Sequence, residues 1–106
     1  MNKVYFVDAT WESGKAFIGY TDENLLDKQV KFVRCSNNNI AELLAANFLI
    51  EVKGKAVEIK TDSMYVIQQL ADSGVHITHV PREKNLANVL VRTFKESQKL
   101  KTRRNV

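Results

Sequence analysis

The chain contains the stretch Ile59-Lys60-Thr61-Asp62-Ser63-Met64-Tyr65-Val66-Ile67, in which the pattern of a β-strand changes to that of a helix. It predicts a strand over 56–60, a turn over 61–63 and a short helix over 64–71. A further strand is predicted over 75–80. Because strands joined by a helix are normally parallel with a right-handed crossover, this stretch predicts that part of the sheet is parallel.

The segments before this unit complete the predicted sheet. Three strands are expected over 3–8, 15–21 and 29–35, and their short connections predict an antiparallel meander. A long helix should follow the Asn-rich segment 36–39 and end at Gly54, since apolar residues recur at helical spacing between them. The predicted fold class is α/β, with order βββαβαβα and a mixed five-stranded sheet flanked by three helices.

Length and composition indicate one small domain. With about 100–200 residues per domain as the usual range, the 106 residues should form a single domain over 1–100, whose last helix covers 84–100. A basic tail over 101–106 follows, which we interpret as a solvated chain end, the alternative being an arm that binds phosphates. The net charge of +4 is compatible with a polyanionic partner without establishing one.

Cysteine content and hydropathy predict a cytoplasmic protein with no membrane partner. The single cysteine, Cys35, cannot form an internal disulfide, which fits a reducing compartment. The first residues reach an acid, Asp8, too early for a signal peptide. No apolar run approaches the ~18–20 residues that span a bilayer. An edge strand in so small a domain is compatible with either a monomer or a dimer.

Three acids, Asp8, Glu42 and Asp62, stand where the predicted topology brings them together. Taken alone, each has an ordinary structural explanation: Asp8 would end a strand, Glu42 would belong to a capping box, and Asp62 would be a helix N-cap. If the first and fourth strands are parallel neighbours, however, Asp8 and Asp62 lie side by side, and Glu42 reaches them from the first turn of its helix. Clustered carboxylates repel one another, and a hard cation such as Mg²⁺ or Mn²⁺ relieves that repulsion.

The sequence resembles the ribonuclease H family, type 1, through four motifs in the expected order. The first, over 4–11, ends in Asp-Ala-Thr-Trp, and the second, over 38–42, is Asn-Asn-Ile-Ala-Glu. The third, over 59–67, contains Thr-Asp-Ser-Met-Tyr-Val, and the fourth, over 79–85, contains Val-Pro-Arg-Glu-Lys-Asn. Each motif is weak alone, whereas four on the expected elements identify the chain as a compact member with a ribonuclease H-like fold.

The resemblance implies a phosphodiester hydrolase that cuts the RNA strand of RNA–DNA hybrids. Members use two divalent ions, of which one helps to generate the attacking hydroxide and the other stabilises the leaving 3′ oxygen. Carried over to this chain, Asp8, Glu42 and Asp62 fill three of the four ligand positions, with Asp8 bridging the ions, here Mg²⁺ or Mn²⁺. The positions that match nucleic-acid contacts of the family are Asn38, Asn39, Ser63 and Arg82. Recognition of shape and of the 2′-OH would separate RNA from DNA.

The fourth ligand position departs from the family pattern. Members have Asn-x-x-Ala-Asp, whereas this chain has Asn-Leu-Ala-Asn over 85–88, so that Asn88 replaces the acid and the spacing is one residue short. An amide oxygen can ligate a metal but brings no charge, so the second ion should bind more weakly. One hypothesis is a weakened endoribonuclease. The alternative is a catalytically impaired domain that binds nucleic acid or protein, and a third is another nucleic-acid chemistry on the same fold.

Overall fold

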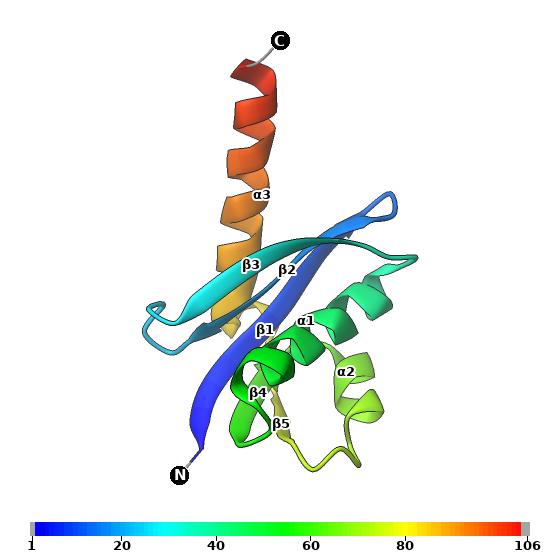
Figure 1. Cartoon of the computed structure of the whole chain (residues 1–106), viewed down its shortest axis with the longest axis vertical. Coiled ribbons are helices and arrows are strands. Elements are labelled where there is room, and N and C mark those ends of the chain that lie inside the picture. Colours follow the sequence, from blue (N-terminus) through cyan, green and yellow to red (C-terminus); the bar gives the residue numbers. More distant parts are fainter. Residues whose placement is uncertain (1, 105–106) are drawn as a thin grey trace.

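The computed structural model describes the backbone of residues 2–104 and the side chains of residues 2–98. Over this part the chain forms a five-stranded sheet covered by three α-helices (Figure 1). The strands are β1 (Lys3–Glu12), β2 (Lys15–Asp22), β3 (Lys28–Arg34), β4 (Val57–Thr61) and β5 (His76–His79). The helices are α1 (Asn38–Lys53), α2 (Met64–Gln69) and α3 (Leu86–Arg104), with a 3₁₀ turn, η1 (Arg82–Lys84), before α3.

The sheet is mixed, in the order β3-β2-β1-β4-β5. The first three strands pair antiparallel, whereas β4 pairs parallel with both β1 and β5. The predicted meander, the predicted parallel pair of the fourth and fifth strands and the α/β fold class are therefore confirmed. The first and fourth strands are parallel neighbours, which is the condition under which Asp8 and Asp62 were expected to meet. Because β4 and β5 are joined through α2, the parallel pair has the helical crossover that its sequence predicts.

Helices cover both faces of the sheet, and β1 supplies side chains to each. Tyr5, Val7 and Ala9 are buried in the core cluster that also holds Leu49 of α1. Phe6 points the other way and packs in the cluster that contains Ala87 of α3. Since successive side chains of a strand alternate between its faces, the side chain of residue 8 also belongs to the α3 face.

The helix α3 packs against the sheet at a glycine. Gly19 of β2 pairs with Asp8 of β1, and a Cβ atom built on Gly19 would lie only 2.9 Å from Cγ1 of Val91. Directly paired residues of antiparallel strands point to the same face. The missing side chain at Gly19 therefore lets α3 lie against the sheet right beside Asp8.

The strand β1 is longer than predicted, and the prediction that Asp8 ends it is wrong. The strand continues to Glu12 because it pairs with β2 along the whole hairpin. Its parallel pairing with β4 stops earlier, at Phe6 opposite Lys60. Beyond that point β1 has a strand partner on one side only, and the edge that faces away from β2 is open to other groups.

The helix ends differ from prediction in two places that concern the site. Asn37 is the N-cap of α1, since its Oδ1 atom accepts a hydrogen bond from the Ile40 backbone N–H at 2.9 Å. Glu42 therefore lies beyond the first turn of α1, and the predicted capping box is wrong. The last helix starts two residues later than predicted, because η1 precedes it, and its backbone is helical to Arg104. The side chains of the predicted tail lie outside the described residues.

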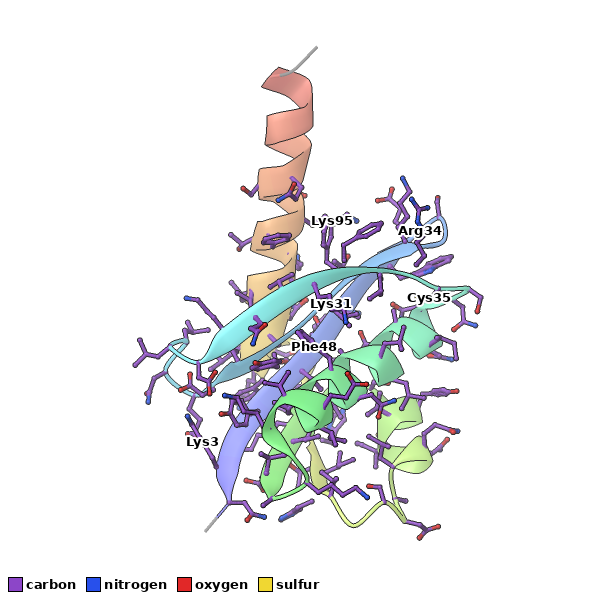
Figure 2. All side chains as sticks on the ribbon, viewed as in Figure 1. Lys3, Lys31, Arg34, Cys35, Phe48 and Lys95 are labelled. Atoms are coloured by element: carbon purple, nitrogen blue, oxygen red, sulfur yellow. The ribbon has the colours of Figure 1, made fainter. Side chains whose placement is uncertain are left out.

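Two contacts tie the hairpin and the edge strand to the helices. Nζ of Lys95 in α3 lies 3.0 Å from Oε2 of Glu12, close to the tip of the β1–β2 hairpin (Figure 2). Nζ of Lys31 in β3 lies 5.1 Å from the centre of the Phe48 ring in α1. The end of α3 projects beyond the sheet (Figure 1). Among the described residues, no helix combines the length and the apolar character needed to cross a membrane.

Candidate active site

The site begins with Asp8, at the point where β1 loses its neighbour β4. Its side chain lies on the α3 face, opposite Gly19, and the residue is only 5% exposed. A carboxylate buried to this extent is costly unless a charge or a hydrogen bond compensates it. Asp8 is therefore not an ordinary solvated residue of a strand, and its burial requires a compensating group.

Glu42 reaches the same point from the other face of the sheet. It is buried, and its Oε1 atom accepts a hydrogen bond from the backbone N–H of Ala9 at 3.0 Å. This N–H belongs to the part of β1 that extends past β4, so the side chain of Glu42 satisfies a backbone donor that no strand partner takes. This hydrogen bond holds the carboxylate of Glu42 at the unpaired edge of β1, next to Asp8.

Asp62 follows directly after β4 and enters the site from there. The alternative explanation, that Asp62 caps the short helix, is wrong, because Ser63 does so: its Oγ atom accepts a hydrogen bond from the Val66 N–H at 3.2 Å. The carboxylate of Asp62 is therefore not engaged in capping. It is half-buried and accepts a hydrogen bond from Nδ2 of Asn85 at 3.4 Å.

Asn85 positions several parts of the site, although its sequence context indicated no role beyond its motif. Besides Asp62, its Nδ2 atom donates to the carbonyl oxygen of Val7 at 3.0 Å. Its Oδ1 atom accepts from the Ala87 N–H at 3.0 Å, as an N-cap side chain does at the start of a helix. One buried amide thus joins β1, the end of β4 and the start of α3. Its place in the fourth motif was the signal that could have identified it.

The three carboxylates form one cluster. Each of Asp8, Glu42 and Asp62 contributes one carboxylate oxygen, and these three oxygens lie within 4.8 Å of one another. Burial raises the pKa of Asp8, and the neighbouring charge of Asp62 raises it further. Burial also raises the pKa of Glu42, with the charge of Asp8 as the second cause. Without a cation the cluster therefore holds a proton that ordinary carboxylates would have lost at neutral pH.

A comparison with protein families agrees with this geometry. The model of the RNase H family matches residues 2–106. The chain belongs to the RNase H family. No curated protein matches it. Since the match covers essentially the whole chain, the predicted resemblance is confirmed, and with it the ribonuclease H-like fold.

A pocket of about 390 Å³ opens beside the carboxylates of this RNase H domain, between β1, the start of α1 and α3. Asp8 and Asn88 both line it, so that Asn88 lies on the wall of the site. Asn38 and Arg82 line it too, whereas Asn39 and Ser63 are not among the described residues of its wall. The structure thus brings two of the four predicted nucleic-acid contacts to the carboxylates.

Other residues of the pocket wall were not predicted from the sequence. Arg92 and Lys95 of α3 add two cations to that of Arg82. They could have been found only by knowing which face α3 turns to the sheet. Trp11 also lines the pocket, while its Nε1 atom donates to the Cys35 carbonyl oxygen at 3.0 Å. A second pocket of about 470 Å³, lined by Phe17 and others, adjoins at Lys95 and holds none of the three clustered acids.

Proposed function

We propose that this RNase H domain is a divalent-metal-dependent endoribonuclease that cuts the RNA strand of RNA–DNA hybrids. The observation that carries the proposal is the cluster of Asp8, Glu42 and Asp62, with its oxygens within 4.8 Å and two of its members buried. A structural role alone gives no reason to bury two carboxylates and place a third against them, because the arrangement destabilises the fold.

The residues of the cluster fit Mg²⁺ or Mn²⁺. All three offer carboxylate oxygens, which hard cations prefer, and no nitrogen or sulfur ligand stands among them. Such a cation neutralises charge at the reacting phosphate and lowers the pKa of a water. In this chain Asp8, Glu42 and Asp62 would hold it, Asn85 would orient Asp62, and the amide of Asn88 would offer a neutral oxygen at the fourth position.

Two of the four proposed nucleic-acid contacts line the pocket beside this cluster. Asn38 and Arg82 share the pocket wall with Asp8, which supports a role in binding the backbone of the hybrid. Asn39 is exposed near the N-terminus of α1, and Ser63 keeps its hydroxyl proton available because its oxygen accepts the capping bond. These four residues can contact phosphates and sugars, which position a nucleic acid, and 2′-hydroxyls, which mark RNA.

Cleavage of an end-labelled RNA–DNA hybrid, with Mg²⁺ and separately with Mn²⁺, tests the proposal. The RNA strand should be cut, and Asp8→Asn should abolish the cutting while circular dichroism shows a folded protein. Single-stranded RNA, double-stranded DNA and a four-way junction serve as alternative substrates, so that another chemistry on this fold is detected. Failure of folded wild-type protein to cut any of them would refute the enzymatic proposal.

Asn88 favours a second candidate function, that of an impaired domain which binds nucleic acid or a protein. Replacing the charged fourth ligand by an amide weakens the hold on a second cation. Under the first proposal Asn88→Asp raises the cleavage rate and the affinity for Mn²⁺. If Asn88→Asp changes neither, and calorimetry detects no bound ion, the carboxylates are structural and the hybrid affinity becomes the property to measure.

A further inference from the structure

The helix α3 turns a row of polar side chains toward the pocket beside the carboxylates. Asn88, Arg92 and Lys95 all line that pocket. Residues three and four apart share one face of a helix, so these three form a continuous row. The row starts at the position where the family has its fourth acid and runs toward the β1–β2 hairpin.

The placement of this row is fixed by packing. Ala87 and Val91 are fully buried against the sheet, which sets the rotation of α3. Val91 packs over Gly19, the residue paired with Asp8, which sets the distance of α3 from β1. Arg92 follows Val91 directly, and it lines the same pocket as Asp8.

The three cationic side chains of the pocket wall differ in the acidic groups that they already interact with. Nζ of Lys95 lies 3.0 Å from Oε2 of Glu12. The charge of Arg82 acts on Asp8, whose pKa it lowers against the larger effect of burial. Arg92 is exposed, and among the side chains that the structure describes none forms an ion pair with it. None of the described residues takes a hydrogen bond from its guanidinium, whose five donors form the planar fork that matches a phosphate.

We propose that Arg92 contacts the phosphodiester beside Asp8 and supplies positive charge there. This charge takes the place of a second cation, which the neutral amide of Asn88 does not bind. The inference rests on the proposed function and deepens it. In the hydrolysis a water oxygen forms a bond to phosphorus and the bond to the 3′ oxygen breaks. One water proton ends on that oxygen, and the other stays with the 5′-phosphate product until it titrates. The negative charge of the phosphate oxygens is what a guanidinium neutralises.

The first test measures contact without cutting. Binding of a fluorescent RNA–DNA hybrid is followed by anisotropy in EDTA over a range of salt concentrations. Each phosphate contact contributes about 0.9 to the slope of log affinity against log salt. Arg92→Gln should lower the slope by roughly that amount, Arg92→Lys should restore most of it, and Arg34→Gln on β3 should leave it unchanged. Equal slopes for wild type and Arg92→Gln overturn the proposed contact.

The second test asks whether Arg92 stands in for a cation. Electron paramagnetic resonance counts Mn²⁺ per chain, and we expect one ion in wild type and a second in Asn88→Asp. Arg92→Gln should slow cleavage by about 100-fold in wild type, the order of one lost charge-stabilising donor. In Asn88→Asp the same substitution should slow it less than about tenfold, because the second ion takes over the role. Equal losses in both backgrounds, or two ions in wild type, overturn the proposal.

The two tests separate this inference from the proposed function. If wild-type protein cuts no hybrid, the endoribonuclease proposal fails, and with it the role of Arg92 in cleavage. The salt slope still reports whether Arg92 contacts phosphates. If the hybrid is cut but neither the slope nor the ion count behaves as expected, the endoribonuclease stands and the inference about Arg92 is wrong.

Discussion

Replacing Asp8 by Asn should stabilise the metal-free protein at neutral pH while it abolishes activity. Asp8 is 5% exposed and lies against Glu42 and Asp62, so the folded state has to bury its charge among other acids. Asparagine has nearly the same shape and carries no charge. Its side-chain oxygen can still accept a hydrogen bond from the protonated carboxyl of Glu42.

The magnitude follows from the pKa of Asp8. Burial and the charge of Asp62 raise this pKa from 3.8 to about 6. At about 1.36 kcal/mol for each pH unit, ionising Asp8 destabilises the folded state by about 3 kcal/mol, as an upper figure. Because the folded pKa is raised, the penalty is absent below pH 3.8, grows as the pH rises from 3.8 to about 6, and is complete above pH 6. We expect Asp8→Asn to gain about 1–3 kcal/mol over wild type between pH 4 and pH 7.5.

Urea unfolding in EDTA, followed by circular dichroism at a series of pH values, measures this difference. Acids outside the cluster titrate equally in both proteins and cancel from the comparison. Within it, loss of the Asp8 charge lowers the pKa of Glu42, which adds to the gain. Asp27→Asn is the matched control with the opposite sign, since a hydrogen bond from Lys53 lowers the pKa of Asp27. That substitution should destabilise the protein at neutral pH and matter less in acid. The reasoning is refuted if the gain of Asp8→Asn does not grow between pH 4 and pH 7.5.

Three further predictions concern the cation, the close packing and the bridging amide. Adding Mg²⁺ or Mn²⁺ at pH 7 should release protons from the cluster and raise the melting temperature, as calorimetry in buffers of different ionisation enthalpy can measure; Asp62→Asn should reduce both effects. Gly19→Ala should cost about 1–3 kcal/mol of stability, because its Cβ atom would lie 2.9 Å from Cγ1 of Val91. The double variant Gly19→Ala, Val91→Ala should lose less stability than the sum of the two single variants, as urea unfolding can measure. Asn85→Ala should cost about 1–3 kcal/mol, since the buried Val7 carbonyl loses its donor, and should weaken Mn²⁺ binding by misplacing Asp62; unchanged Mn²⁺ affinity in a folded variant would contradict that positioning role.

The sequence was sufficient for the order of the elements and for the mixed sheet, and the meeting of Asp8 and Asp62 then depended on one condition. A strand, a helix and a second strand predict the parallel pair of β4 and β5, and the strand order of the structure meets the condition by making β1 and β4 parallel neighbours. Two acids near the same ends of parallel neighbours lie close together whatever the details of packing. This step needed no knowledge of strand length, which is why it succeeded although the end of β1 was predicted four residues too early.

The roles of the single acids were not predictable in the same way, because their local explanations were all plausible. Three successive asparagines can each cap a helix, and only the structure shows that Asn37 does so. That choice moves Glu42 out of the first turn and leaves it to bond the N–H of Ala9, a residue 33 positions away. Likewise Ser63, and not Asp62, is the cap of α2. Capping signals are local, and they do not reveal which of two adjacent oxygens a distant part of the chain uses.

The residues that α3 contributes to the pocket wall were the least predictable part of the site, for a physical reason. A helix with buried residues at 87 and 91 can still shift or rotate by the width of a side chain, and its charged residues then face solvent or the site accordingly. In this chain Gly19 removes that freedom by admitting Val91 to the sheet surface beside Asp8. The position of Arg92 in the pocket thus depends on the absence of a side chain in another strand.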